Sequence, residues 1–271
     1  MFKEKLNRLI QEKDSLLCIG LDSDIRKIPP FLLDEEDPLL IFNREIIEAT
    51  ADLAIAYKPN IAFYETLGST GWQLLEKTLQ YLPGDCLVIA DAKRGDIGNS
   101  TNKYAELYFH TYSFDAITLS PYMGFDSIQP FLEYDDKASF ILCLTSNAGS
   151  HDFQYLNIES EPLYLKIARK VSEWNLRHGN CGIVVGATHP ENLSSIREVA
   201  PHLPFLIPGI GIQGGNLQLT VQYGTDEKGL GAIISISRSI IYASAEKDFA
   251  QAARDIALSY MNDINTIRKS K

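Results

Sequence analysis

The sequence lacks long hydrophobic runs and any excess of positive charge. Its longest apolar runs, such as residues 231–236, are far shorter than the roughly 20 residues that a membrane-spanning helix needs. The first residues mix charges and lead into an amphipathic pattern, which does not fit a signal peptide. The chain carries 25 Lys and Arg against 35 Asp and Glu, a net charge of -10. We therefore expect a cytoplasmic protein whose partners include neither nucleic acid nor a membrane.

Cysteine and histidine are scarce and show no metal-binding pattern. The four cysteines have neither metal-ligand nor redox spacing, and each lies in or beside an apolar run: Cys18, Cys86, Cys143 and Cys181. We expect them to be buried free thiols in a reducing compartment. The five histidines form no His-x-His or His-Glu-x-x-His pair. The sequence therefore predicts no metal site.

What the sequence does contain is a regular alternation of short apolar runs and amphipathic stretches. Eight runs are predicted as strands: residues 15–21, 53–58, 86–91, 116–119, 139–144, 182–185, 204–207 and 231–235. They are continuously apolar, which is typical of parallel strands buried on both faces. We predict an α/β fold, a single (β/α)8 TIM barrel with a closed parallel sheet, in which residues 1–271 form one domain. An open, doubly wound sheet is the alternative.

Charged residues stand where the first three predicted strands end. Asp91 ends the third strand, and Lys93 and Asp96 follow it two and five positions later. Asp22 and Lys58 end the first and second strands. The carboxyl ends of barrel strands form the active face, so we expect these charges to converge in one catalytic pocket. An ion pair that only closes the barrel mouth is the alternative.

A glycine-rich loop follows the seventh strand, and an arginine follows the eighth. The loop, residues 208–215, reads Pro-Gly-Ile-Gly-Ile-Gln-Gly-Gly. Its glycines let backbone N–H groups approach a phosphate, and Arg238 would supply a charged partner. The glycine spacing also fits the dinucleotide fingerprint, but a loop after a seventh strand does not open a nucleotide-binding unit. We predict a phosphate site here; the alternative is a glycine-rich turn beside a surface arginine.

Taken in order, these segments resemble the orotidine 5'-phosphate decarboxylase family. The family signature, Asp-x-Lys-x-x-Asp-Ile, stands here at residues 91–97. Further segments resemble the longer bacterial (type 2) branch: residues 56–60, 120–124, 145–147, 185–190 and 208–215. A sugar-phosphate branch of the same superfamily shares the signature. The full set of segments in this order is specific to the orotidine 5'-phosphate decarboxylase family.

The resemblance implies decarboxylation of orotidine 5'-monophosphate (OMP) to uridine 5'-monophosphate (UMP), the final step of de novo pyrimidine nucleotide synthesis, without metal or organic cofactor. Lys93 would protonate the ring carbon that loses carbon dioxide, and Asp91, Asp96 and Lys58 would complete the catalytic set. The implied substrate-binding residues are Asp22, Thr101, Ser146, Pro208, Gln213, Gly214, Ser237 and Arg238. Asp96 and Thr101 would reach into the neighbouring subunit's site, which implies a homodimer.

Two other functions stay open at this point. One is a pentulose-phosphate decarboxylase or aldolase of the same barrel superfamily, which relies on magnesium and on extra acidic ligands near the second strand. Here Lys58 is followed by Pro59 and Asn60, which favours the nucleotide branch. The other is a nucleotide sensor, which would not need Lys93 and two aspartates in its pocket. One position departs from the resemblance, because many family members have glycine where Ser237 precedes Arg238.

Overall fold

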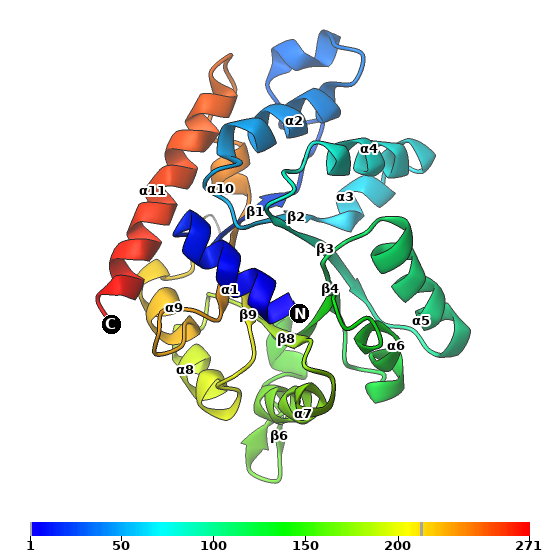
Figure 1. Ribbon diagram of the computed structural model, residues 1–271, viewed down its shortest axis with the longest axis vertical. Helices are drawn as coiled ribbons and strands as arrows, with labels where there is room; N and C mark the ends of the chain where they lie inside the picture. The colour runs from blue at the N-terminus through cyan, green and yellow to red at the C-terminus, as the bar shows by residue number, and fades with distance from the viewer. Residues whose placement is uncertain (1, 212–213) are drawn as a thin grey trace.

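Eight parallel strands close into a barrel, with the helices arranged around it (Figure 1). The structure is a computed structural model and describes residues 2–211 and 214–271. Around the barrel the strand order is β1-β10-β9-β8-β5-β4-β3-β2, so β1 and β10 pair and leave no edge. The predicted closed barrel is confirmed, and the open sheet is excluded.

Each of the eight predicted apolar runs overlaps a barrel strand. The strands are β1 (Leu17–Leu21), β2 (Ala56–Pro59), β3 (Leu87–Arg94), β4 (Ala116–Leu119), β5 (Ala138–Leu144), β8 (Cys181–Val185), β9 (Phe205–Pro208) and β10 (Ala232–Ile236). Most residues of these strands are buried, as expected for strands packed on both faces. The exception is β3, which continues three residues beyond Asp91 and carries charged side chains there. A separate short hairpin, β6 (Asn157–Ile158) and β7 (Glu161–Pro162), follows β5 along the chain.

The helices lie outside the barrel, and some of them begin or end at residues that favour those positions. They are α2 (Pro38–Thr50), α3 (Ile61–Glu65), α4 (Ser69–Gln80), α5 (Gly98–Ala105), the π-helical η2 (Glu106–Thr111), α6 (Gln129–Leu132), α7 (Leu163–His178), α8 (Pro190–Val199), α9 (Leu217–Gly224), α10 (Arg238–Ile241) and α11 (Phe249–Lys269). Proline opens α2 and α8, where its missing N–H has no helical partner to lose. Gly179 ends α7 in the left-handed conformation, with φ 76°. None of the helices in the described ranges is long and apolar enough to cross a membrane.

The N-terminal helix α1 (Phe2–Lys13) covers one end of the barrel (Figure 1). The Phe2 ring lies edge-on to Phe140 inside the barrel, with 6.0 Å between ring centroids. Lys5 Nζ donates to Asp115 Oδ1 at 2.6 Å, and Asp115 directly precedes β4. The helix thus lies at the amino ends of the strands, and the opposite end of the barrel remains for a site.

All four cysteines are free and buried, as the sequence predicted. Among the described residues, no group of three or more His, Cys, Asp or Glu side chains is arranged to hold a metal ion.

Candidate active site

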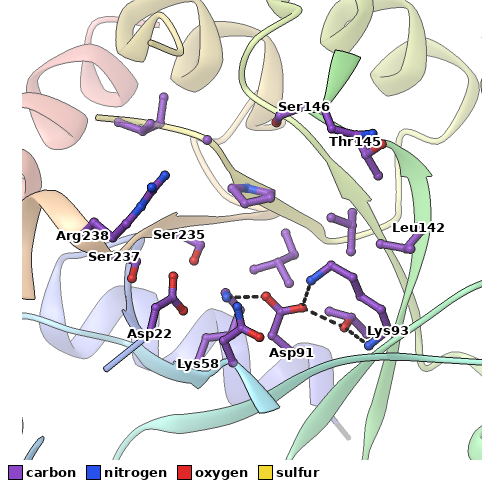
Figure 2. A pocket seen from close by; sticks show the side chains of 18 of the residues that line it. Asp22, Lys58, Asp91, Lys93, Leu142, Thr145, Ser146, Ser235, Ser237 and Arg238 are labelled. Atoms are coloured by element: carbon purple, nitrogen blue, oxygen red, sulfur yellow. Dashed lines mark hydrogen bonds and ion pairs between the residues drawn. The ribbon is translucent and has the colours of Figure 1, made fainter. Parts of the chain in front are cut away.

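A cavity of about 280 Å³ lies at the carboxyl ends of the barrel strands (Figure 2). Eight of the twelve predicted site residues line it: Asp22, Lys58, Asp91, Lys93, Ser146, Pro208, Ser237 and Arg238. They come from the ends of different strands, and the closed barrel brings these ends together. Leu142, Val184 and Leu206 add apolar surface to the wall. The predicted convergence of charged residues is therefore present for four of the five: Asp96 does not line this cavity in the described structure.

Three charged side chains form a continuous row across the cavity. Lys58 Nζ donates to Asp91 Oδ2 at 2.7 Å, and Lys93 Nζ donates to Asp91 Oδ1 at 2.5 Å (Figure 2). The side chains of Lys58 and Asp91 are 6% and 12% exposed, whereas that of Lys93 is 51% exposed. Lys93 is thus the member of the row that an incoming ligand meets most directly.

Pairing keeps the two buried members of this row, Lys58 and Asp91, ionised. Burial by itself would raise the pKa of the Asp91 carboxyl, but the ammonium groups of Lys58 and Lys93 outweigh it and hold that pKa well below its usual value. Burial would likewise lower the pKa of Lys58, and the carboxylates of Asp91 and Asp22 reverse this effect, so that the pKa is raised. The site therefore presents an ionised carboxylate that is hydrogen-bonded to the side chains of two lysines.

The backbone of β3 is distorted at Lys93. This residue has φ 47°, a conformation that L-residues other than glycine rarely adopt. The register between β3 and β4 also shifts between Ala90 and Arg94. Thr118, on β4, binds both parts of the row: it accepts from Lys93 N at 2.9 Å and donates to Asp91 Oδ1 at 3.2 Å. Strained backbone of this kind persists only where its surroundings hold it in place.

Buried oxygen atoms around the cavity lack partners that a ligand would supply. Asp22 Oδ1, Ser146 Oγ and Ser239 Oγ are buried and make no hydrogen bond to any residue in the ranges 2–211 and 214–271. Leaving such groups unpaired is costly, so each marks a position where a ligand or water binds. All three residues line the cavity, and they follow three different strands, β1, β5 and β10, which favours a polar ligand with several contacts.

Arg238 lies at the side of the cavity away from Lys93 (Figure 2), and Pro208, Gly209 and Ile210 of the glycine-rich segment also line the cavity. Gly209 and Gly211 have φ 108° and 86°, which glycine adopts without strain. Ser237, the position that departs from the family resemblance, donates its hydroxyl to Gly20 O at 3.1 Å. Gly214 is described but does not line the cavity, and Gln213 lies outside the described residues.

A model of the orotidine 5'-phosphate decarboxylase / HUMPS family matches residues 15–256. The chain belongs to this family. A relative named orotidine 5'-phosphate decarboxylase from Dehalococcoides mccartyi is 49% identical, with 99% of this chain and 98% of that protein covered. Another of the same name from Flavobacterium johnsoniae is 44% identical over the full length of both proteins. The solved structure of Leishmania donovani OMP decarboxylase superposes with a TM-score of 0.85 at 39% identity, covering 98% of each chain.

The second half of the decarboxylase signature lies apart from the cavity. Asp96 lines a separate surface depression together with Asn99, Ser100 and Lys103. Thr101 is buried in its own chain, where its hydroxyl donates to Ser127 O at 3.1 Å. The structure therefore brings neither Asp96 nor Thr101 to the cavity of the same chain.

Sequence reasoning in terms of strand ends missed several polar residues of this decarboxylase-family site. Thr118 lies inside a strand, and its signal was a lone hydroxyl in the otherwise apolar run Ala116–Leu119. Ser235 gave the same signal in β10. Asn60 and Ser239 also line the cavity, each two residues or fewer from a predicted site residue.

Proposed function

We infer that the chain is a carbon–carbon lyase that decarboxylates OMP to UMP, the final step of de novo pyrimidine nucleotide synthesis. The observation that carries this inference is the row of Lys58, Asp91 and Lys93 beside an open cavity, in a chain whose full-length relatives are named orotidine 5'-phosphate decarboxylase. The pentulose-phosphate alternative is not favoured, because relatives at 44 to 49% identity carry the decarboxylase name over nearly the whole chain.

In the proposed reaction Lys93 is the proton donor. Loss of carbon dioxide leaves a carbanion at a ring carbon that delocalises the charge poorly. A fixed ammonium group at that carbon opposes the developing negative charge and then delivers a proton. Because the charge exists mainly in the transition state, this interaction accelerates the reaction and does not merely tighten substrate binding.

Asp91 and Lys58 set the charge that the substrate meets. Asp91 stays ionised because two cations hold it so, and it would lie beside the departing carboxylate of OMP. The repulsion between the two carboxylates ends when neutral carbon dioxide leaves. Lys58 would fix the position of Asp91 and contribute, with Asp22, to binding the ribose hydroxyls.

The remaining polar groups would bind the two ends of the nucleotide. Ser146, whose buried hydroxyl lacks a partner among the described residues, would bind the edge of the pyrimidine. The phosphate would lie against Arg238 and backbone groups of the loop, with the proposed contacts at Pro208, Gln213, Gly214 and Ser237. Phosphate binding is remote from the reacting bond, yet its binding energy can position the ring for the reaction.

The proposed enzyme is a cytoplasmic homodimer of one catalytic domain, residues 1–271, and uses no metal or organic cofactor. Asp96 would reach the partner's cavity from its exposed depression. Thr101 was predicted to do the same, but its hydroxyl is already bonded within its own chain, so direct contact would require that side chain to turn outward.

Ultraviolet absorbance of OMP with purified protein tests the reaction. We expect turnover that is unchanged by a chelator, since no metal takes part. Absence of turnover would refute the decarboxylase function, and chelator sensitivity would favour the magnesium-dependent alternative.

Lys93→Ala tests the proton donor. We expect turnover to be lost while UMP still binds, because the proposed phosphate and base contacts lie elsewhere. Absorbance assays and calorimetric titration with UMP measure the two effects. Substantial remaining activity would remove Lys93 from its proposed role.

Mixed dimers test the shared site. Lys93→Ala and Asp96→Asn dimers are each expected to be inactive, and their mixture should regain activity through one intact site per heterodimer. Mass spectrometry of the mixture establishes that subunits have exchanged. No recovery after proven exchange would argue against a site built from two subunits.

A further inference from the structure

Arg94 lies inside the signature, between Lys93 and Asp96, but its side chain does not line the cavity of the described structure. The guanidinium lies over the rings of Tyr104 and Tyr108, 5.2 Å and 5.8 Å from their centroids. One of its terminal nitrogens is hydrogen-bonded to the Glu65 carboxylate. The Arg94 side chain is 21% exposed. It therefore ties the end of β3 to the helices outside the barrel, α3 on one side and α5 with η2 on the other (Figure 1).

The backbone on both sides of Lys93 is held as well. Lys93 N donates to Thr118 Oγ1 at 2.9 Å, and Ser120 N donates to Arg94 O at 2.7 Å. These two bonds secure β3 to β4 and to the residue after it, across the shift in register. They do not fix the direction in which the chain leaves the barrel after residue 94. The Arg94 side chain supplies that constraint, since it contacts α3 on one side and α5 with η2 on the other.

We propose that Arg94 is a positioning residue that serves two active sites. Through the residue before it, Arg94 holds Lys93 in the strained conformation that directs the ammonium group to Asp91. Through the residues after it, Arg94 sets the path of the segment that presents Asp96 to the partner subunit. This inference rests on the proposed function, because it assumes that Asp96 completes the partner's site.

The chemistry of the contacts requires arginine. A planar guanidinium can stack on two aromatic rings and pair with a carboxylate, whereas the ammonium group of lysine cannot provide the same flat contact. A merely structural ion pair at a partly exposed position would contribute little, and its removal would leave turnover unchanged. The two interpretations therefore differ in their effect on turnover.

The first test compares Arg94→Met with Arg254→Met. Arg254 also pairs with a carboxylate, Asp52, at 2.6 Å, but on the outer surface at α11, and serves as the matched control. Displacing a catalytic group by about 1 Å costs about 100-fold, so we expect kcat of Arg94→Met to fall by roughly 10- to 100-fold. UMP affinity and the unfolding midpoint should stay near those of the control. Wild-type kcat in Arg94→Met would overturn the proposal.

Two further variants test the proposal if Arg94→Met does not fold. Arg94→Lys keeps the charge and Glu65→Gln keeps the guanidinium, and both are expected to fold. We expect kcat to fall in both, with UMP binding retained. Full activity in both variants would overturn the role of this contact.

Mixed dimers separate the two roles of Arg94. If Arg94 positions only Lys93, an Arg94→Met subunit still offers a sound Asp96 and restores activity when mixed with Asp96→Asn. If it positions only Asp96, it restores activity when mixed with Lys93→Ala. We expect neither mixture to recover, and recovery in either would overturn the dual role. Lys93→Ala mixed with Asp96→Asn is the control: its failure would contradict the shared site, whereas the kcat of Arg94→Met would still decide whether Arg94 positions Lys93.

Discussion

At the scale of single residues, Asp91 is the group on which the site is organised. Its two oxygens are taken by two different ammonium groups, and Thr118 adds a third contact. The sequence was sufficient to predict that these charges meet, because strand ends converge in a barrel. It did not predict that Asp91 lies between the lysines, since that arrangement depends on the distortion of β3 at Lys93.

Asp91→Asn tests this arrangement through stability. The substitution leaves Lys58, which is 4% exposed, without its closest carboxylate. Breaking a buried pair in this way costs about 3–5 kcal/mol, so we expect a loss of that order in the free energy of unfolding at pH 7. Urea unfolding of both proteins measures the difference.

The same comparison has a predicted pH dependence. The pKa of Asp91 is depressed in the folded state, so its stabilising contribution is complete above its usual value of 3.8 and is lost as the pH falls below it. The pKa of Lys58 is raised, so its contribution is lost only above its usual 10.5. The difference in the free energy of unfolding between the wild-type protein and Asp91→Asn should be constant from about pH 5 to 8. This difference should become smaller toward pH 3. A constant difference down to pH 3 would contradict the ionised state of Asp91.

Gly186 governs the position of Ser146. A Cβ atom at residue 186 would lie 2.2 Å from Ser146 Oγ and 2.9 Å from Ser146 N. Gly186→Ala should therefore move Ser146 and weaken UMP binding by about 2- to 15-fold, the effect of one lost hydrogen bond. Ser146→Ala is the matched variant, and the double variant should be no weaker than either single one because both remove the same contact. Additive losses in calorimetric titrations would show that Gly186 acts in some other way.

At the scale of elements, the sequence predicted each strand to within three residues, and the error at β3 is informative. Apolar character ends at Ala90, so the prediction stopped at Asp91, whereas the strand continues to Arg94. Pairing with β4 extends it, because Ser120 N donates to Arg94 O. Such pairing between distant residues overrides local composition, and hydrophobicity along one strand carries no record of it.

Arg197 secures several elements at the end of the barrel away from the site. From α8 it donates to the carbonyls of Leu203, Gly224 and Gly231, which lie before β9, at the end of α9 and before β10. Hydrogen bonds to charged groups are worth about 1.5–3 kcal/mol each, so Arg197→Met should lower the free energy of unfolding by about 3 kcal/mol or more. Turnover should be unchanged. Urea unfolding and absorbance assays test both points, and Arg254→Met, with an expected loss below about 1 kcal/mol, is the control.

At the scale of the whole molecule, eight apolar runs were enough to predict the closed barrel, because strands buried on both faces need helices all around them. The place of α1 could not be predicted in the same way. Its amphipathic pattern indicates that one face is buried, but not that the face lies against the amino ends of the strands. The arrangement of subunits is also beyond the pattern of one chain, so the role of Asp96 stays a prediction.

The position of α1 has a consequence for the order of events in the cavity. Phe2 and the other buried residues of α1 lie at the amino ends of the strands and close that end of the barrel, so the entrance to the cavity lies at the carboxyl ends. Substrate, carbon dioxide and product would all pass through that entrance. Carbon dioxide formed deep in the site would have to escape past the bound nucleotide or wait for it to leave. Faster release of the nucleotide would then speed the release of both products. Product release through this entrance would limit the turnover rate.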